Sequence, residues 1–425
     1  MPGPLHGVRV LEFTLVVAGP MSGVLLSDLG ADVIKVEPPG GESTRQSRAV
    51  VPDESKLFQA FNRGKRDIVV DLQTPEGREV IYRLMPSVDV VVANYRYGVP
   101  KKIGIDYDTL KQYRPDLIYV ESTGFGTRGE LATRGCSDVV AQAYSGIMAG
   151  DAKVAEDGAP MPASFGAPAD YATAMASAMG VCAALFNRSL TGKGQRINTS
   201  LLRTGVWLQS HNVNHEPVTD ALFDDVTRTQ LNETRAAGGS YPELIRVRQE
   251  GRFTGGLYYG GYAAQDGGII LGALTKLNRD GFRRVLGLED EPSDEPGYDI
   301  LDPDNQRLAE HYLEVMRAKM RERTVDEWIE IFDAQGLPAA PVNFPEEIRL
   351  DEQVQAEGIF VDLEHDVTGP QSSVGPVLEM SETPTAASGA APPLARDTRG
   401  VMLEAGYTEA EVDALIAQGA VVQAG

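Results

Sequence analysis

The first third of the chain alternates short apolar segments with segments of helical periodicity. Each apolar segment is rich in Val and Ile and is followed by turn residues, which is typical of buried strands. The predicted strands are Val8–Phe13, Asp32–Glu37, Arg66–Leu72, Val88–Asn94 and Leu117–Ser122. Helices are expected from Pro20 and Thr74, because proline suits a first helical turn and threonine can cap one. This alternation predicts βαβ units and an α/β fold with a mainly parallel sheet.

The middle of the chain predicts a long helix of small residues, followed by a second, smaller domain. Ala and Gly dominate Asp170–Leu185, and small side chains allow a helix to approach its neighbours closely. Strands are predicted at Gly256–Tyr262 and Gly268–Leu274, and amphipathic helices at Asn305–Arg321 and Thr324–Gln335. This second set of elements indicates a separate domain over about residues 225–330.

Composition narrows the class of protein. The chain has 425 residues, of which 42% are hydrophobic and 24% charged, as in globular proteins that bury a large core. With 61 acidic and 39 basic residues the formal charge is −22, so nucleic acid is not an expected partner. An acidic run at Leu286–Asp302 is expected to be a solvated loop. A small anion can still bind at a local basic cluster, because salt screens charges beyond about 8–10 Å.

The sequence shows no sign of export or of a membrane span. Its apolar stretches, such as Val90–Ala93 and Ile269–Leu274, are far shorter than the ~20 residues that a membrane helix needs. The N-terminus lacks the regions of a signal peptide, and two cysteines, Cys136 and Cys182, cannot form a disulfide framework. We therefore expect a cytoplasmic protein with no membrane partner.

Motifs of several common enzyme classes are missing from the positions where they belong. The turn after Phe13 reads T-L-V-V-A-G-P rather than G-x-G-x-x-G, which argues against a nicotinamide or flavin site. Thr191–Gln195 (TGKGQ) lacks the spacing of a P-loop, and Ser145 is not in a G-x-S-x-G elbow. His211 and His215 are spaced i, i+4 without the glutamate of H-E-x-x-H, so no metal site is predicted.

A series of short motifs follows in order along nearly the whole chain. It comprises A-G-P at Ala18–Pro20, L-G-A-D-V-I-K-V-E at Leu29–Glu37, N-R-G-K-R-D-I-V-V-D-L at Asn62–Leu72, T-P-E-G at Thr74–Gly77, D-V-V-A-Q-A-Y-S-G at Asp138–Gly146, T-G-K-G-Q at Thr191–Gln195 and G-L-P-A-A-P-V at Gly336–Val342. This series resembles the family III CoA transferases, the group that includes formyl-CoA transferase, carnitine CoA transferases and the α-methylacyl-CoA racemases. An ordered set is far more specific than any one motif.

The resemblance implies a domain layout and a set of substrates. It implies a large Rossmann-like parallel-sheet domain built from both chain ends, a smaller inserted α+β domain and an interlocked homodimer. The expected parts are a large domain over 1–205, a linker over 206–224, a small domain over 225–330, a linker over 331–345 and a C-terminal segment over 346–425 that completes the large domain. The implied substrates are an acyl-CoA thioester and a free carboxylic acid, with no permanently bound cofactor.

Asp170 is the nucleophile that the resemblance implies. It ends the sequence Gly166–Asp170, a G-x-P-x-D pattern that stands where these enzymes carry their catalytic aspartate. From the residues alone, an aspartate before a helix is as readily an N-cap, which is worth about 1 kcal/mol. At the positive end of a helix we expect this carboxylate to stay ionised, as a nucleophile must.

Two further features are expected around the covalent intermediate. The backbone N–H of Tyr171 follows the nucleophile and is the expected donor to the tetrahedral oxyanion. By resemblance, a mobile glycine loop at Gly255 and Gly256, or at Gly238 and Gly239, would cover the intermediate. The run of glycines is shorter than the loop of formyl-CoA transferase.

The expected CoA contacts combine cations for the phosphates with a cleft for adenine. The resemblance places them at Val17, Ala18, Arg45, Lys65, Arg66, Asn94, Tyr95, Lys102, Ile103, Ser137 and Asp138. For Arg45, Lys65 and Arg66 the alternative is a solvated basic face. Val17 stands where formyl-CoA transferase has glutamine, and Pro38 where it has arginine, so formyl-CoA is not the expected donor.

The expected activity is CoA transfer, and two alternatives stay open. A racemase needs a histidine paired with the aspartate, and Ser137 occupies that position, where it cannot act as a general base without a partner. A non-catalytic CoA-binding protein is disfavoured by Asp170, and Cys136 has no identified activating partner. The acceptor is expected to be a dicarboxylate such as succinate, malate, mesaconate or oxalate, although carnitine-like and aromatic acids are not excluded. Candidate cations for the second carboxylate are Arg228, Arg235, Arg246 and Arg248.

Overall fold

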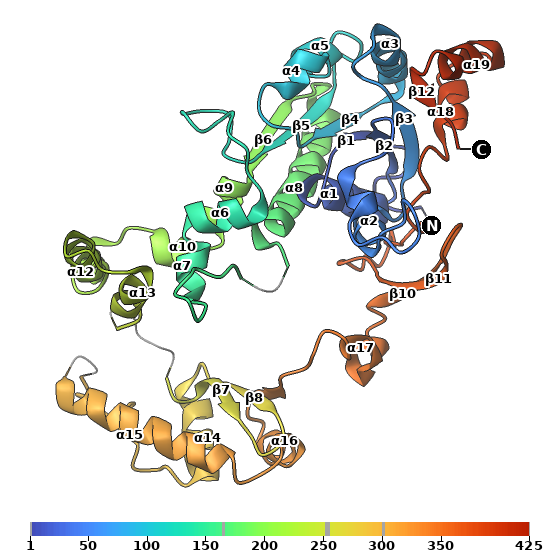
Figure 1. The fold of residues 1–425 in the computed structure, drawn as a ribbon. Coiled ribbons are helices and arrows are strands. Elements are labelled where there is room, and N and C mark those ends of the chain that lie inside the picture. The colour runs from blue at the N-terminus through green and yellow to red at the C-terminus, as the bar shows by residue number, and fades with distance from the viewer. Residues whose placement is uncertain (1, 164–165, 251–255, 300–301, 425) are drawn as a thin grey trace. The chain divides into compact units, whose positions relative to one another are not determined.

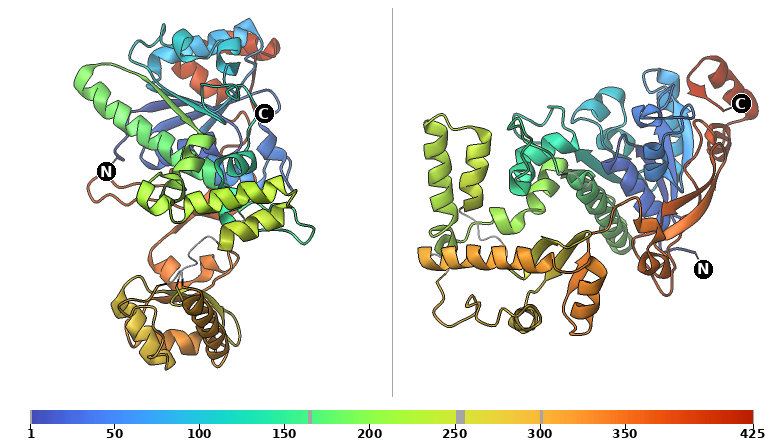
Figure 2. Two further views of the ribbon diagram at one scale, coloured as in Figure 1. Left: turned by 90° about the vertical axis from the view of Figure 1, so that its left-hand side faces the viewer. Right: turned by 60° about the horizontal axis from the view of Figure 1, so that its bottom comes forward.

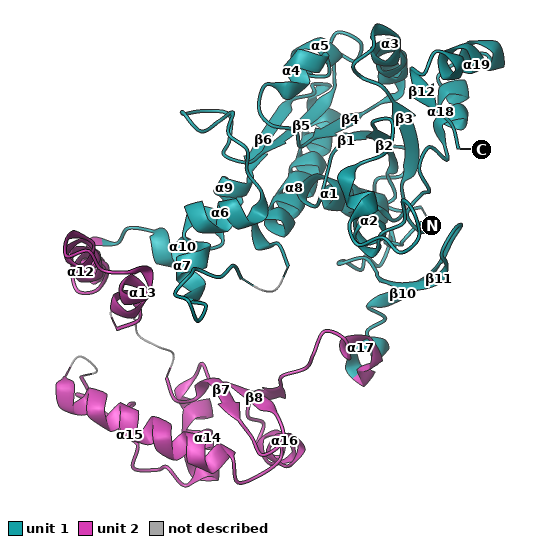
Figure 3. Cartoon of the chain, viewed as in Figure 1, with its two compact units in different colours: residues 1–216, 353–425 teal, residues 217–352 magenta. Residues whose placement is uncertain are grey.

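The computed structural model describes residues 2–163, 166–250, 256–299 and 302–424. The chain forms two compact units, one made of residues 1–216 and 353–425 and the other of residues 217–352 (Figure 3). The second unit interrupts the first in sequence. The segments expected as linkers are partly structured, since one contains α11 (Pro217–Asp220) and the other β9 (Ala339–Pro341).

The first unit is built on a seven-stranded sheet (Figure 1). Its strands, in the order in which they lie, are β12 (Val421–Val422), β3 (Arg66–Val70), β2 (Asp32–Glu37), β1 (Arg9–Phe13), β4 (Val90–Ala93), β5 (Ile118–Thr123) and β6 (Arg196–Ser200). All neighbouring pairs are parallel except β12 with β3. The predicted α/β class with a mainly parallel sheet is therefore confirmed.

Side chains alternate between the two faces of this sheet, and each face carries its own core. On β1, Leu11 and Phe13 belong to one buried cluster, whereas Val10 belongs to another. The first cluster includes residues of α3 (Pro75–Leu84), α18 (Thr398–Glu404) and α19 (Glu409–Ala417). The second includes residues of α1 (Ala18–Asp28) and α8 (Pro168–Thr191). Both faces of the parallel sheet are thus covered, as such sheets require.

α8 is the long helix of small residues that the sequence predicts, and it crosses one face of the sheet beside α1 (Figures 1 and 2). By length and composition alone it is apolar enough to span a membrane. Its buried face, however, includes Ala174, Ala178 and Val181, which pack in the core with strands β4 and β5. Close packing of this kind explains why alanine dominates the helix.

The remaining helices of the first unit are short. They are α2 (Lys56–Asn62), α4 (Val99–Ile103), α5 (Tyr107–Leu110), α6 (Asp138–Ser145), α7 (Ile147–Asp151), α9 (Leu201–Trp207) and α10 (Ser210–Val213), with 3-10 turns at Ser43–Gln46 and Met85–Ser87. The C-terminal segment adds the hairpin β10 (Phe360–His365) and β11 (Gly369–Val374). As expected, Thr74 caps α3, and its hydroxyl oxygen accepts the Gly77 N–H at 3.0 Å.

The second unit has its own three-stranded antiparallel sheet and its own core. β8 (Gly268–Gly272) lies between β7 (Tyr259–Ala263) and β9. The other elements of this unit are α12 (Asp224–Ala236), α13 (Tyr241–Glu250), α14 (Lys276–Leu286), α15 (Pro303–Met320), α16 (Val325–Asp333) and a 3-10 turn at Ile348–Leu350, with α17 (Glu352–Ala356) at its boundary.

The acidic run in this unit is not simply a solvated loop, which corrects the expectation from sequence. Glu291 is 5% exposed, and its carboxylate accepts from the Arg283 guanidinium at 2.7 Å. Arg279 and Arg283 also hold the pKa of Asp294 down to about 2. The run folds back onto α14 because these two arginines neutralise it.

Candidate active site

The order of the strands places a crevice at the carboxyl ends of β1 and β4. Sheets of this kind bind ligands where the chain reverses its direction of winding, which here is between these two strands. Asn94 follows β4 and accepts the Leu15 N–H at 2.8 Å, while its side-chain NH2 donates to the Leu15 carbonyl, also at 2.8 Å. Asn94 therefore fixes the β1–α1 turn, which leads into Val17 and Ala18.

Asp170 lies in the first turn of α8, at one side of this crevice. Gly166, at φ 81°, reverses the chain before the helix, and Pro168 occupies the first turn. The N-cap of α8 is Ala167, which makes no side-chain capping bond. Asp170 is 8% exposed, and within the described part of the chain its carboxylate accepts no hydrogen bond. The alternative that Asp170 is merely the cap of its own helix is therefore wrong.

Another carboxylate satisfies the helix terminus instead. Asp138, in the first turn of α6, accepts the Ala169 N–H at 2.8 Å and the Asp170 N–H at 3.1 Å with one oxygen. Its second oxygen accepts from the Gln142 amide, and Gln142 in turn accepts the Ala163 N–H at 2.8 Å. Because Asp138 takes the free amides, the Asp170 carboxylate stays available for chemistry.

The protonation of Asp170 differs from the expectation that the helix dipole keeps it fully ionised. Burial first, and the negative charge of Asp138 second, raise the pKa of Asp170 to about 7. The same surroundings raise the pKa of the Cys136 thiol to about 11, with burial again the first cause. Near neutral pH, Asp170 thus exchanges readily between carboxylate and acid, whereas Cys136 stays a thiol and is a poor nucleophile.

The expected oxyanion donor is already used. The Tyr171 N–H donates to the Ala167 carbonyl at 3.0 Å as part of α8, so it is not free to stabilise an oxyanion. The Tyr171 ring is 39% exposed and meets Phe61 edge-on, with 6.1 Å between the ring centroids. Gly255 lies outside the described residues, and Gly256 is an exposed residue of the second unit.

Two of the basic residues assigned to CoA are used inside the protein. The Arg45 guanidinium is fully buried, binds Glu37 at 2.7 Å and lies 3.7 Å from Asp67. Lys65 is 2% exposed and donates to Glu12 and to the Pro20 and Phe61 carbonyls, while burial lowers its pKa to about 8. As placed here, neither side chain presents its charge to a ligand, which differs from both the phosphate-binding and the solvated-face interpretations.

Arg66 is separated from the crevice by the length of a strand. It begins β3, at the amino end of the sheet, and binds Asp32 at 2.6 Å and Glu404 at 2.7 Å. This end of the sheet has a small polar cavity of about 380 Å³, lined in part by Asp32, Arg66 and Glu364. Arg66 thus belongs to a different region from Asp170.

The other residues assigned to CoA gather closer to the crevice. Asn94 and Tyr95 follow β4, and Lys102 is exposed on α4, which begins five residues after Asn94. The neighbouring Ile103 packs against the core. Ser137 is the N-cap of α6, but its hydroxyl makes no capping bond.

Arg96 is a candidate that the sequence reasoning missed. It is exposed directly after Tyr95, and its guanidinium lies so close to Gly135 that an added Cβ there would be 2.8 Å from Nη2. In the portions of the chain that the structure describes, this guanidinium has no hydrogen bond or ion pair. The signal was available in the sequence, because Arg96 is the first cation after the strand that borders the crevice.

The described residues provide no cluster of three or more His, Cys, Asp or Glu side chains that could hold a metal ion. His211 lies in α10, which ends at Val213, so His215 is not on the same helix. Arg228 and Arg235 lie on α12 and Arg246 and Arg248 on α13, in the second unit.

Comparison with known proteins gives the class and the family of this chain. A model of "CoA-transferase family III" matches residues 5–398. The chain belongs to this family and is a CoA transferase.

Relatives and a solved structure agree with that assignment. The succinate–glutarate CoA-transferase of Agrobacterium fabrum is 33% identical, over 94% of this chain and 95% of that protein. The succinyl-CoA:mesaconate CoA-transferase of Haloarcula hispanica is 31% identical, over 95% of this chain and 97% of that protein. The crystal structure of a CAIB/BAIF family protein from Brucella suis has a TM-score of 0.73 at 28% identity, covering 95% of this chain and 100% of that one.

Proposed function

We propose that this enzyme moves CoA from an acyl-CoA donor to a carboxylic acid through a covalent aspartyl-CoA thioester on Asp170. The observation that carries the proposal is the state of the Asp170 carboxylate. It is nearly buried at a helix N-terminus, yet the amides of that terminus are taken by Asp138, so its oxygens are free to attack.

The proposed reaction is a series of acyl substitutions in which carboxylates and the CoA thiolate replace one another at carbonyl carbons. An Asp170 oxygen attacks the thioester carbon of the donor, the C–S bond breaks, and a mixed anhydride and CoA thiolate result. The thiolate attacks the Asp170 carboxyl carbon and releases the donor acid, which leaves aspartyl-CoA. The acceptor carboxylate then attacks this thioester and expels the thiolate, which finally attacks the acceptor-derived carbon and frees Asp170.

The near-neutral pKa of Asp170 fits this path. A buried carboxylate without hydrogen-bond partners is more nucleophilic than a solvated one, because little solvation is lost on attack. Only the ionised fraction attacks, and with a pKa of about 7 that fraction is about half at neutral pH.

For CoA, we propose the crevice beside β4. Arg96 and Lys102 would meet the phosphates, and Asn94 and Tyr95 would line the nucleotide cleft beside Val17 and Ala18. Arg96 and Lys102 are both exposed, so they can reach a phosphate without losing a protein partner.

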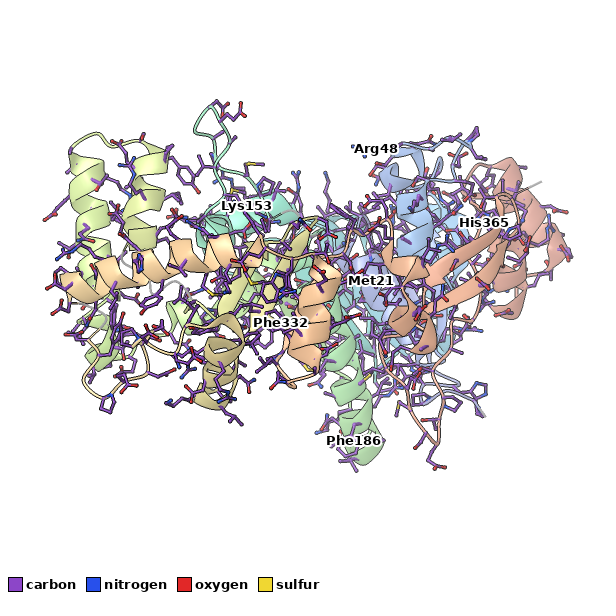
Figure 4. All side chains as sticks on the ribbon, turned by 90° about the horizontal axis from the view of Figure 1, so that it is seen from below. Met21, Arg48, Lys153, Phe186, Phe332 and His365 are labelled. Atoms are coloured by element: carbon purple, nitrogen blue, oxygen red, sulfur yellow. The ribbon has the colours of Figure 1, made fainter. Side chains whose placement is uncertain are left out.

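We also propose that the acceptor is a dicarboxylic acid and that the enzyme is a homodimer. The relatives described above carry the names of succinate, glutarate and mesaconate in their activities. The dimer is supported by an apolar stripe near the C-terminal end of α8, where Phe186 and Leu190 are 68–70% exposed. Figure 4 shows Phe186 projecting from the far end of α8. A second copy of the chain would cover this stripe.

The test is intact-protein and peptide mass spectrometry after incubation with acyl-CoA donors. A CoA adduct on the peptide that contains Asp170 is expected in the native enzyme and not in Asp170→Asn. α-Proton exchange in heavy water without an adduct would contradict the proposal and favour a racemase. That alternative has little support, because Asp138 is engaged in hydrogen bonds and Cys136 stays protonated.

A further inference from the structure

A large cavity opens in the first unit beside the helix that carries Asp170. It measures about 1550 Å³, and its lining includes Gly166, Pro168 and Tyr171, which flank the nucleophile in sequence. Most of the wall is apolar, with side chains such as Leu25, Leu29, Met175, Met179, Trp207 and Leu208. A carbon chain that enters this cavity would therefore meet a hydrophobic wall.

One cation stands in this wall with its charge unused. Arg203, on α9, lines the cavity, and among the described residues its guanidinium has no hydrogen bond or ion pair. The two carboxylates in the same wall are engaged elsewhere, since Asp28 binds Arg63 and Asp151 binds Lys153 at 3.2 Å. Arg203 is thus free to receive an anion from outside the protein.

The position of Arg203 is fixed relative to the nucleophile. Its neighbour Thr204 is buried, and the Thr204 hydroxyl contacts the Ala169 carbonyl at 3.1 Å and the Thr173 hydroxyl at 2.6 Å. These bonds attach α9 to the first turn of α8, one residue from Asp170. The backbone of Arg203 is therefore held close to the first turn of α8, while its longer side chain stays free to turn toward a ligand in the cavity.

We propose that Arg203 binds the distal carboxylate of a dicarboxylic acid whose other carboxyl group reacts at Asp170. This inference rests on the proposed function and names the residue that selects the substrate class. The planar guanidinium can hold a carboxylate through two parallel N–H···O bonds, while the apolar wall accepts the methylene chain. A monocarboxylic acid of equal length gains no such contact.

The experiment compares Arg203→Met and Arg203→Lys with the native enzyme. Succinyl-CoA is the donor, and the acceptors are glutarate and pentanoate, which have the same number of carbons. We expect Arg203→Met to raise KM for glutarate by about 10- to 100-fold, as for loss of a charge-assisted bond, and to leave pentanoate unchanged. Arg203→Lys keeps the charge but loses the two-bond geometry, so its KM should fall between. Arg196→Met, at the opposite end of β6, is the matched control.

Three results would overturn the inference. One is an equal loss with both acceptors. Another is a native preference for pentanoate, and the third is a changed molecular mass of Arg203→Met in solution, which would give Arg203 a role in subunit contact. The CoA adduct on Asp170 separates the two proposals. If the adduct forms but glutarate is not favoured, only the role of Arg203 fails, whereas absence of an adduct in the native enzyme means that the proposed function fails as well.

Discussion

Removing the charge of Asp138 should make the enzyme more active in acid. Burial is the larger and Asp138 the smaller of the two causes that raise the pKa of Asp170 from 3.8 to about 7. Asp138 therefore accounts for less than half of a rise of about 3 units, so Asp138→Asn should lower the pKa of Asp170 by about 1, to about 6. In the proposed mechanism the nucleophile is the carboxylate, so the acidic limb of the kcat/KM profile should move to lower pH by the same amount.

The size of the effect depends on pH in a defined way. At pH 6 the ionised fraction of Asp170 should rise from about one-tenth to about one-half, which predicts an increase in kcat/KM of about 5-fold. At pH 8 both forms are almost fully ionised, and the ratio should approach one. The assay is the initial rate of CoA transfer between pH 5 and 9, with circular dichroism to confirm that the enzyme stays folded.

The variants separate the charge of Asp138 from its hydrogen bonds. In Asp138→Asn an amide oxygen still accepts the Ala169 and Asp170 N–H groups, whereas its NH2 group opposes the Gln142 amide and should cost about 1 kcal/mol of stability. Asp138→Ala removes the charge and also frees the Ala169 and Asp170 amides to bind Asp170, so its profile should shift at least as far to lower pH while kcat falls. Asp108→Asn, at a carboxylate paired with Lys111 at 2.7 Å outside the cavity, should leave the profile unchanged. An acidic limb that stays in place, or moves to higher pH, in Asp138→Asn would refute the electrostatic reasoning.

Three further outcomes are expected. An acid whose pKa is raised on folding binds protons more tightly in the folded state, so the stability of the protein falls as pH rises from about 4 to 7. Asp170→Asn removes this effect and should stabilise the protein by up to about 4 kcal/mol at pH 8 and hardly at pH 4. Thermal unfolding at the two pH values measures the difference. Arg45→Met should destabilise by about 3–5 kcal/mol, because it leaves Glu37 buried without its partner, and denaturant unfolding measures this loss. Arg96→Met should weaken CoA binding by about 10- to 100-fold in calorimetric titration without changing the unfolding midpoint; unchanged affinity would remove Arg96 from the CoA site.

The sequence predicts the central strands well and the edges of the sheet poorly. Strands β1 to β5 are buried on both faces, and each carries at least three apolar side chains that mark it in the sequence. β6 (Arg196–Ser200) has mainly polar side chains, and β12 has only two residues that pair with Val69 and Val70. An edge strand is defined mainly by its pairing with a neighbouring strand. When that neighbour is far away in sequence, the pairing leaves no local pattern of residues.

The site is predictable only as far as its position in the chain. Motif order indicates Asp170 as the candidate nucleophile. Whether a basic side chain is available to a ligand depends instead on carboxylate partners that are distant in sequence. In the sequence Arg45 is a plausible phosphate ligand, but in the structure Glu37 and Asp67 from adjacent strands surround its guanidinium. Among the described residues Arg96 has no carboxylate partner, so its charge is not neutralised within the protein. The number of carboxylates within reach, rather than the residue type, separates the two arginines.

The same reasoning explains why two aspartates at helix starts have different roles. Asp138 and Asp170 both lie in a first turn, and by helix propensity each could cap its own helix. The folding of α6 against α8 gives the amides of α8 to Asp138, across 31 and 32 residues of sequence. Among the described residues the Asp170 carboxylate then has no hydrogen-bond donor, and it is buried near a like charge, which raises its pKa. In the proposed mechanism the capping of α8 by Asp138 thus contributes to the reactivity of Asp170, because amides left free would bind the Asp170 carboxylate and make it less reactive.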